Sequence, residues 1–516
     1  MDNVWSSEFT KDFDKRYGRT EYDKKWKKKN SSQRWTRTSE TDFYERNKLT
    51  ANAENFEHSM EYPSELIEYM KQIACIIKDD PVVSGDLQRK CLEECRGSEI
   101  SLCKYSTSCF LIDEIFNGYH DAAKQWMIEI MQSGKETSLQ LICMPWACHT
   151  LECLLSSLSN VLDTKVNQAA KKSFGKIASV ALNYSLVNAL LNNESVSLVL
   201  QDVVECDSVV QTGYLRRFVK AACRDPDSVL KQWKGKQASH LWDIIVQKAD
   251  EDLRQILYHS VLEGKLFYLS LHMFANFPVQ KYMLSVKSNE LIINVFDELM
   301  SHFMDICAEF KWGIIVALVQ MAHNKNEVAI VKKLRNYFGC RSRSARPAFV
   351  PCVFTLACRT SEQFMGTFDV VKGQLYGSLI LQELINYEHN KTVIMSIKSL
   401  TDTTILELAR DKKGSFLLQA LFKSSTVSRT DKELIAKPLK LKWHEVITNN
   451  VSNYVFDVLW ANNLYDIMEK EKLMDELSKA VIGNHCKMLR LMCTKLNLRK
   501  FREQRKKWLK EQEQDL

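Results

Sequence analysis

A short set of polar and aromatic side chains recurs along this chain of 516 residues. In the stretch ANFPVQKYM, Asn276 is followed directly by Phe277 and, three residues later, by Gln280. The two amides could donate and accept hydrogen bonds, and the ring could stack on a flat partner. Residues 276 and 280 are one turn apart on a helix, so a single helix could present all three side chains together.

The proline in this stretch indicates where the helix begins. Asn is a favoured N-cap residue, and a proline in the first turn costs no hydrogen bond. We therefore expect Asn276 to cap a helix and Pro278 to lie in its first turn. The three side chains would then point away from the apolar stripe of that helix.

The same pattern occurs in eight other stretches. Each has a small or polar pair, two apolar residues, a polar residue, a variable residue and two more apolar residues. The stretches are SCFLIDEIF (108–116), ACHTLECLL (147–155), SVSLVLQDVV (195–204), ASHLWDIIV (238–246), WGIIVALV (312–319), YGSLILQELI (376–385), GSFLLQALF (414–422) and SNYVFDVLW (452–460). In GSFLLQALF the apolar residues fall on one stripe of a helix. The fit is weakest in WGIIVALV.

The spacing of these stretches predicts a repeat protein. Neighbouring stretches are 36 to 49 residues apart, except for a gap of 66 residues between Trp312 and Ser378. That gap leaves room for a degenerate unit around Arg346 to Ala357, and a last unit is expected at GNHCKMLRL (483–491). About ten or eleven units of about 38 residues would then fill the chain from about residue 60 to 495. Such a unit cannot bury its own apolar face, so stacked units must cover one another in an all-α solenoid.

The composition agrees with a folded helical protein. Only 16 Gly and 8 Pro are present, which favours helices over turn-rich sheets. Hydrophobic residues make up 45% of the chain and charged residues 26%, as in soluble folded proteins. The formal net charge of +7 is compatible with a polyanionic partner without proving one.

The two ends of the chain differ from the repeats. Residues 1–60 include KKWKKK (24–29) and show little apolar periodicity, so we expect a charged, mostly disordered arm. The lysines fit an import signal, a phosphate contact or a merely solvated charge run. The repeat solenoid is expected over residues 61–495, and a charged C-terminal helix and tail over residues 496–516.

Signals for catalysis, metal binding and export are missing from the sequence. The 16 cysteines form no CxxC pair and are interpreted as reduced thiols that serve as small apolar residues. No P-loop, HExxH or GxSxG motif is present. His149, His240 and His272 lack partners at ligand spacing, so we expect structural or stacking roles for them. The prediction is a binding protein of the cytoplasm or nucleus, with no membrane segment, metal, cofactor or enzymatic activity.

The repeated set resembles the Pumilio (PUF) repeat, and the order of ANFPVQ, GSLILQELI, LARDKKGSFLLQALFKSSTVSRTDKE and LNLRKFREQRKKW resembles the nucleolar protein 9 family. The resemblance runs from about Tyr62 to Trp508. It implies about eleven repeats in a curved solenoid whose concave face binds RNA. It also implies binding to precursor rRNA near the 3′ end of the small-subunit rRNA, where premature cleavage is restrained. The implied location is the nucleolus, and the implied partners are small-subunit pre-ribosomal assembly factors, with the protein itself a monomer.

The same resemblance assigns a role to each residue of the set. The first and last residues hydrogen-bond a base edge, and the middle one stacks between bases. The implied sets are Asn276, Phe277 and Gln280; Ser378, Leu379 and Gln382; Ser415, Phe416 and Gln419; Asn453, Tyr454 and Asp457; Cys148, His149 and Glu152; Cys109, Phe110 and Asp113; and Ser239, His240 and Asp243. The set with Glu152 resembles one that pairs a small residue with an acid, and in PUF proteins such a set tends to bind guanine. The sets with Asp depart from the pattern because Asp is shorter than Gln, so a simple code of one base per repeat is not expected.

Other interpretations stay open from the sequence alone. The first residue of each set could be only a helix cap, the middle one part of the core between repeats, and Gln only a solvated side chain. At the level of the whole chain, the alternatives are a protein-binding helical scaffold of the HEAT or armadillo kind and a cytoplasmic PUF-type regulator of messenger RNA. A polar inner face that carries the sets favours RNA, whereas an apolar groove would favour a peptide.

Overall fold

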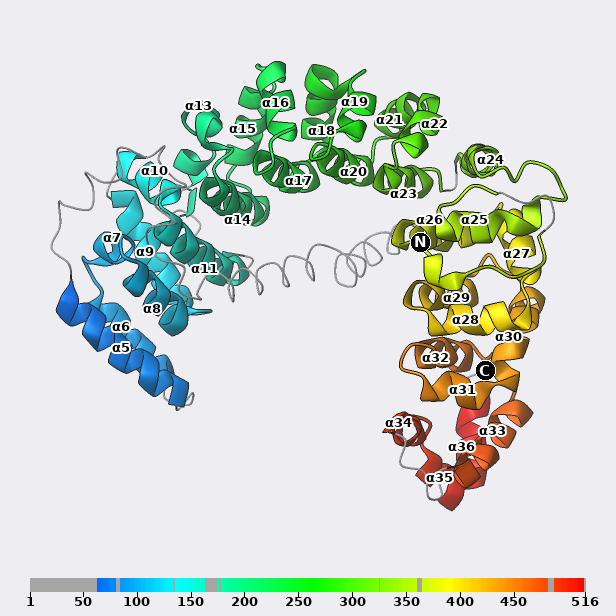
Figure 1. Ribbon diagram of the computed structural model, residues 1–516. Coiled ribbons are helices and arrows are strands. Elements are labelled where there is room, and N and C mark those ends of the chain that lie inside the picture. The colour runs from blue at the N-terminus through cyan, green and yellow to red at the C-terminus, as the bar shows by residue number, and fades with distance from the viewer. Residues whose placement is uncertain are drawn as a thin grey trace. The chain divides into compact units, whose positions relative to one another are not determined.

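The computed structural model describes residues 63–79, 84–132, 135–162, 174–175, 178–323, 325–359, 364–480 and 487–514 (Figure 1). Over these residues the regular structure is helical, and the predicted all-α solenoid is confirmed. The expected N-terminal arm, residues 1–60, lies outside the described residues. In the described part of the chain, no helix is long and apolar enough to cross a membrane.

The chain divides into two compact units, residues 1–115 and 116–516. In the first, α5 packs on α6, and the side chains of Met70, Cys91 and Cys95 are fully buried. The helices of this part are α5 (Ser64–Asp79), α6 (Ser84–Glu94), α7 (Glu99–Leu102) and α8 (Ser106–Phe116), which ends at the boundary.

The second compact part, residues 116–516, repeats a motif of three helices. From here on, a unit means one such repeat. The first helices are α9 (His120–Gln132), α15 (Tyr214–Ala222), α18 (Glu251–Leu257), α21 (Asn289–Ser301), α24 (Glu327–Tyr337), α27 (Lys391–Lys398), α30 (Arg429–Leu441) and α33 (Ile467–Ala480). The second helices are α10 (Lys135–Cys143), α13 (Tyr184–Val187), α16 (Pro226–Trp233), α19 (Leu266–Leu271), α22 (Phe303–Ala308), α25 (Phe349–Thr355), α28 (Asp402–Arg410) and α31 (Trp443–Thr448). The third helices are α11 (Pro145–Leu162), α14 (Glu194–Val210), α17 (Ala238–Lys248), α20 (Asn276–Ser285), α23 (Trp312–Met321), α26 (Leu375–Ile385), α29 (Lys412–Lys423) and α32 (Asn453–Ala461).

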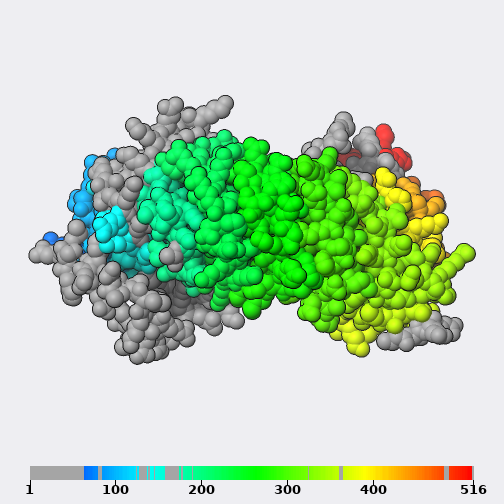
Figure 2. All heavy atoms as spheres, turned by 90° about the horizontal axis from the view of Figure 1, so that it is seen from above, coloured from blue at the N-terminus to red at the C-terminus, as the bar shows by residue number. Residues whose placement is uncertain are grey.

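The third helices pack against one another in chain order, from α11 to α32 without a break. We call them the third-helix row. Figure 2 shows the residues of consecutive units side by side, in the order of their colours. The row forms one continuous surface, because stacked repeats place their third helices side by side.

The apolar stripe predicted in GSFLLQALF is buried. Leu417, Leu418, Leu421 and Phe422 of α29 have no exposed surface. Gly414 lets the preceding helix approach, because a Cβ there would clash with the carbonyl oxygen of Leu408 at the end of α28. The glycine in the repeated stretch therefore serves close packing of the second helix on the third.

The gap of 66 residues does not hold a separate unit among the described residues. The sequence suggested a degenerate repeat around Arg346 to Ala357, but α23 packs directly on α26, and no third helix lies between them among the described residues. The segment contains η4 (Arg346–Ala348) and α25, which is the second helix of the unit that ends in α26. The gap of 66 residues thus arises from long connections within one enlarged unit. The connection before α26 folds against the next unit, where Thr401 N donates to Gly366 O at 2.9 Å.

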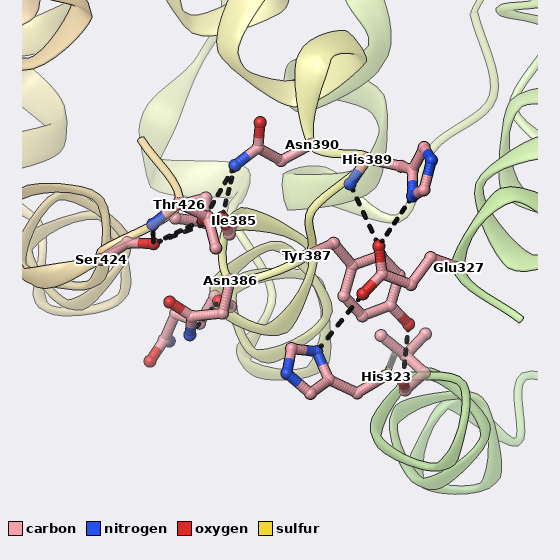
Figure 3. A network of polar contacts seen from close by, with 11 residues as sticks. His323, Glu327, Ile385, Asn386, Tyr387, His389, Asn390, Ser424 and Thr426 are labelled. Atoms are coloured by element: carbon pink, nitrogen blue, oxygen red, sulfur yellow. Dashed lines mark hydrogen bonds and ion pairs between the residues drawn. The ribbon is translucent and has the colours of Figure 1, made fainter. Parts of the chain in front are cut away.

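A buried carboxylate fastens the enlarged unit (Figure 3). Glu327 lies at the start of α24 and accepts hydrogen bonds from the backbone N–H of His389, at 3.0 Å, and from its ring Nδ1, at 3.2 Å. The ring of His323, just after α23, lies 3.6 Å from the other carboxylate oxygen. Beside it, Tyr387 donates its hydroxyl to Val319 O. Glu327 therefore joins the end of one unit to the corner between α26 and α27.

The last helices fold back on α33. Trp508, in α36 (Arg505–Gln514), is buried and donates its indole N–H to Leu496 O at 3.1 Å. Arg505 binds both carboxylate oxygens of Asp475, at 2.7 and 2.9 Å. The other helices here are α34 (Lys487–Lys495), which packs on α31, and α35 (Leu498–Glu503). Residues 483–486 of the expected last unit lie outside the described residues.

Replacing Glu327 with Ala should loosen the corner between α26 and α27. The change leaves the His389 N–H without its acceptor, and a hydrogen bond to a charged group contributes about 2 kcal/mol. Hydrogen exchange measured by mass spectrometry should show faster exchange over residues 387–398. Glu388→Ala, at an exposed neighbouring position, is the matched control and should leave exchange unchanged. Equal protection in the Glu327 variant would show that this network does not hold the corner.

Candidate nucleic-acid interface

The predicted sets within residues 116–516 lie in the first turns of the third helices. Because these helices are stacked in one row, the six sets on α11, α17, α20, α26, α29 and α32 recur from helix to helix. The seventh set, Cys109, Phe110 and Asp113, lies on α8. We number positions in each stretch so that Asn276 is position 2, Phe277 is position 3 and Gln280 is position 6.

The residues at positions 2 and 6 are joined by hydrogen bonds in several units. Gln280 donates its side-chain amide to Asn276 Oδ1 at 2.9 Å, and Gln382 donates to Ser378 Oγ at 3.0 Å. In α11 the Cys148 Sγ lies 3.7 Å from Glu152 Oε1. These polar pairs are therefore brought together before any ligand is bound.

A further pair was missed in the predicted sets. In α14, Gln201 donates to Ser197 Oγ at 3.3 Å, the same contact that Gln382 makes with Ser378. With the half-buried Leu198 between them, these residues form a set of the predicted kind. Its signal was the stretch SVSLVLQDVV, whose middle residue is aliphatic rather than aromatic.

Position 2 also links neighbouring units. Cys148 donates to Ser195 O at 3.0 Å, Ser197 to Gln237 O at 2.8 Å, and Ser378 to Lys413 O at 2.7 Å. In each case the acceptor lies two residues before position 2 of the next third helix. The contact therefore holds adjacent third helices in a constant register.

Two other serines at position 2 bond a backbone carbonyl three residues earlier in their own unit. Ser239 donates to Lys236 O at 3.1 Å, and Ser415 donates to Lys412 O at 2.8 Å. Both serines are almost completely buried, and so is Asp243, the expected edge reader at position 6 of the same helix as Ser239.

A capping side chain lies four residues before position 2: it is the N-cap residue of α14 and α29, and in the units of α20 and α32 it caps the turn that leads into the helix. Residues Asn193, His272, Asp411 and Asn449 each accept from the two backbone N–H groups that directly precede position 2 of their unit, at 2.8 to 3.4 Å. The expectation that Asn276 caps its helix is therefore wrong: it is the first residue of α20, and its amide donates to His272 O and Met273 O, both at 2.9 Å. Pro278 does lie in the first turn, as expected.

Several side chains at position 3 present aromatic surface. Phe110, Phe277 and Tyr454 are 50%, 43% and 59% exposed. His149 is exposed too, and its ring lies 3.8 Å from Glu152. His240 and Phe416 are half-buried. The predicted contact of Leu379 with a base does not fit the structure. Its side chain is only 6% exposed and belongs to the core, with no face left for a base.

The set on α32 differs from the others. Asn453 is buried, and its side-chain oxygen has no hydrogen-bond partner among the described residues. Asp457, the expected edge reader, forms an ion pair with Lys495 of α34. A base can reach this carboxylate only if the ion pair opens or is shared, so the exposed ring of Tyr454 is the accessible part of this set.

The series of polar sets is interrupted at α23, although the third-helix row itself is continuous there. Trp312, Gly313 and Val316 occupy positions 2, 3 and 6 there, and all three are buried. A Cβ at Gly313 would lie 2.5 to 2.8 Å from the amide of Gln280, so that amide rests where a side chain would be. The missing side chain on α23 thus makes room for the set on α20.

The charge pattern near α20 explains the state of His272. Burial lowers the pKa of its imidazole, and the nearby ammonium groups of Lys234 and Lys311 lower it further. A neutral ring with its proton on Nε2 can accept from both N–H groups at Nδ1. The two lysines place positive charge near His272, in the turn before α20.

A buried carboxylate that the predictions overlooked lies next to Gln382. Burial raises the pKa of the Glu383 carboxyl group, and Gln320 at the end of α23 donates to it at 3.0 Å. This contact ties α23 to α26, so α23 contributes to the register of the row although it carries no set.

No group of three or more His, Cys, Asp or Glu side chains in the described ranges is arranged to hold a metal ion. The site is a row of paired amides, hydroxyls and aromatic faces on stacked helices. Such a row can form hydrogen bonds and stacking contacts with a flat, polar ligand.

Comparison with protein families identifies this architecture. The model of the NOP9-like PUF repeat domain matches residues 117–481. The chain belongs to the NOP9-like PUF repeat family. The family match begins and ends close to the limits of the repeats described above.

Relatives of this PUF repeat chain are distant in sequence. It is 25% identical to "Nucleolar protein 9" of Mus musculus over 275 residues, which cover 50% of this chain and 43% of the relative. It is 23% identical to "Pumilio homolog 23" of Arabidopsis thaliana over 301 residues, 56% of this chain and 38% of the relative. The matched segment thus spans less than half the length of these relatives.

Solved structures support the fold. The structure of APUM23 without its insert region, with GGAAUUGACGG, has a TM-score of 0.64 at 19% identity and covers 88% of this chain and 99% of the other. APUM23 with GGAUUUGACGG gives a TM-score of 0.63 at 18% identity, with 87% and 99% covered. The PUF solenoid is therefore preserved at low sequence identity.

The His272 cap should make α20 sensitive to pH. Because the pKa of His272 is lowered in the folded protein, its contribution to stability is complete above its ordinary value of 6.5 and is lost as the pH falls below it. Losing an N-cap costs about 1 kcal/mol. Hydrogen exchange over residues 274–285 should therefore speed up on acidification, after correction for the intrinsic effect of pH. In His272→Asn, which keeps a capping side chain, this additional change should disappear. An identical pH response in the two proteins would contradict the role of the ring.

Proposed function

We propose that this chain is an RNA-binding factor of ribosome biogenesis that acts in the nucleolus. It would hold single-stranded segments of precursor rRNA near the 3′ end of the small-subunit rRNA and restrain premature cleavage there. Membership of the NOP9-like PUF repeat family supports this proposal, as does similarity to relatives named "Nucleolar protein 9". The similar APUM23 structures carry the RNA sequences GGAAUUGACGG and GGAUUUGACGG.

The observation that carries the proposal is the set on α20. The amides of Asn276 and Gln280 are already in contact at 2.9 Å, and the ring of Phe277 is exposed beside them. A base edge would share or replace the bond between the amides, while its face stacks on the ring. Neighbouring sets lie on successive helices of the row, so one strand could meet several of them in turn.

The protein would protect the RNA by binding it. RNA held along the third-helix row is not available to a nuclease, and the protein needs no catalytic group to protect it. The chain would act as a monomer within small-subunit pre-ribosomal particles, where assembly factors are its expected protein partners. The described residues offer no cluster of metal-binding side chains beside the row that could activate a water for RNA cleavage.

Replacing Phe277 with Ala should weaken binding of single-stranded RNA. Loss of one stacked base costs about 1–3 kcal/mol, which corresponds to a loss of affinity of about 5- to 150-fold. Changing Asn276 and Gln280 together to Ala should relax the preference for the base at that position. Fluorescence anisotropy with a set of oligonucleotides that differ at single positions measures both effects.

Tyr268→Ala is the matched control for this experiment. Tyr268 is 69% exposed but lies on the second helix α19, outside the third-helix row. Its loss should leave RNA affinity unchanged. If the change of both amides alters neither affinity nor base preference while circular dichroism shows an intact helical fold, the set on α20 is structural only.

The protein should protect precursor rRNA from cleavage without cutting it. Purified protein mixed with RNA that spans the small-subunit 3′ end should leave the RNA intact in the presence of magnesium. When a single-strand-specific nuclease is added, cutting should slow by about tenfold or more inside the footprint and stay unchanged outside it, since a bound strand must leave the row before it is cut. Sequencing of the fragments locates the footprint.

The triple variant Phe277→Ala, Phe416→Ala and Tyr454→Ala should lose this protection. These rings make none of the hydrogen bonds between units described above, so the solenoid should stay folded. Tyr268→Ala with Met468→Ala removes two exposed side chains outside the row and serves as control. Protection that survives the triple change, or cleavage by the protein alone, would overturn the proposed function.

A further inference from the structure

A strongly basic stretch of the enlarged unit runs from α24 to just after α25. Residues 328–359 contain seven Lys or Arg residues and no Asp or Glu. The formal net charge of the whole chain is also +7, so the rest of the chain is balanced. Six of these cations, which we call the basic connection, are Lys332, Lys333, Arg335, Arg341, Arg343 and Arg346.

The basic connection is held in a defined shape. Arg335 at the end of α24 donates to Arg341 O at 3.0 Å and to Cys340 O at 3.4 Å. The serine between Arg341 and Arg343 accepts from Ala345 N at 3.2 Å. At its far end, Pro347 O accepts from Ser396 Oγ of α27 at 2.6 Å. The stretch is thus anchored at both ends and lies on the next unit.

The charges of the basic connection have no counter-charge in the described part of the chain. None of its six side chains is within ion-pair distance of a described carboxylate. Elsewhere, exposed arginines pair with acids, as Arg216 does with Asp250 at 2.8 Å. The Nε of Arg346 is buried and has no hydrogen-bond partner among the described residues. Burial lowers the pKa of Arg335, and the nearby Arg346 and Arg341 lower it further, so these guanidinium groups lie close enough to repel.

This surface is separate from the third-helix row. Its residues belong to the first helix α24, the turn after it and η4, and η4 packs on α27, the first helix of the next unit (Figure 1). Lys332, Arg341 and Arg343 are exposed. None of the six residues contributes to a set at positions 2, 3 and 6 of a third helix.

We propose that the basic connection is a second RNA-binding surface, which binds phosphate groups of RNA that extends beyond the segment held on the third-helix row. This inference rests on the proposed function. Like charges held together without acids favour a polyanionic ligand, because its binding removes their mutual repulsion. Guanidinium groups match phosphate oxygens in geometry and donate two hydrogen bonds at once. Contacts of this kind add affinity without reading sequence.

Phosphates reach this surface either from a single strand or from a base-paired segment. Both present the same chemistry, so the RNA probes must distinguish them. We use three RNAs: GGAAUUGACGG alone, the same sequence with a single-stranded extension, and the same sequence with a hairpin extension, each extension tested at both ends. An acidic protein segment is the competing ligand, represented by poly-glutamate.

The variant Lys332→Gln, Arg341→Gln and Arg343→Gln removes three exposed charges without removing the backbone carbonyl that Arg335 binds. The control variant Arg224→Gln, Lys287→Gln and Lys437→Gln removes three exposed charges elsewhere. Affinity is measured by fluorescence anisotropy over a range of salt concentrations. Circular dichroism and thermal unfolding check that both variants are folded.

The basic-connection variant should bind at least one extended RNA about tenfold more weakly than the wild type, and its log–log salt slope should fall by about 2. Binding of GGAAUUGACGG alone should stay unchanged, and the control variant should resemble the wild type throughout. The extension that loses affinity identifies the source of the phosphates.

Other outcomes overturn the inference in distinguishable ways. Equal binding of extended RNA by variant and wild type, or equal losses in both variants, rejects the basic connection while the proposed function stands. Loss of poly-glutamate binding alone assigns the surface to a protein partner. A wild type that binds neither these three RNAs nor precursor rRNA that spans the small-subunit 3′ end rejects the proposed function and this inference together.

Discussion

Close packing of one third helix on the next is the constraint on which the rest of this structure depends. A unit of three short helices leaves one apolar face uncovered, and only the neighbouring unit can cover it. Within a unit, Gly414 lets the second helix α28 approach the third helix α29. Fully buried side chains such as Leu418 fill the core of α29. Hydrogen bonds such as that from Ser378 to Lys413 O then hold the register from one unit to the next. The polar sets recur at a constant position only because this register is constant.

The start of each third helix divides its tasks among three positions. His272 and Asp411 satisfy backbone N–H groups in the turn before the helix. Asn276, four residues after His272, is thereby left to accept from Gln280. On α26, Ser378 bonds both the next unit and Gln382. The ring at position 3 is left for the surface. The same glutamine contact in α14, α20 and α26 indicates that the polar pairs are a property of the architecture and not of one unit.

Periodicity was enough to predict the helical class, the repeat length, the buried stripe of α29 and the positions of most sets. It failed where distant residues decide the outcome. Nothing near Asp457 in the sequence indicates that Lys495 will occupy its carboxylate. The apolar run before Ala357 resembles a repeat, yet α23 contacts α26 directly and leaves no room for another third helix. Leu379 has the right position in its stretch but is covered by the core, and burial of a single side chain depends on contacts that local pattern does not reveal. The capping role of His272 was equally hidden, because histidine is not among the preferred capping residues.

The interruption of the polar sets at α23 has a consequence for any strand that follows the row. Trp312, Gly313 and Val316 offer it neither amide nor exposed ring, and Gln280 covers the glycine. The polar sets therefore form two groups on the row, separated by α23, which carries none. If RNA follows the row as proposed above, α23 gives it no polar set to contact, whereas α20 and α26 do. Under the proposed function, target RNAs compared across species would then show two conserved segments separated by a variable one.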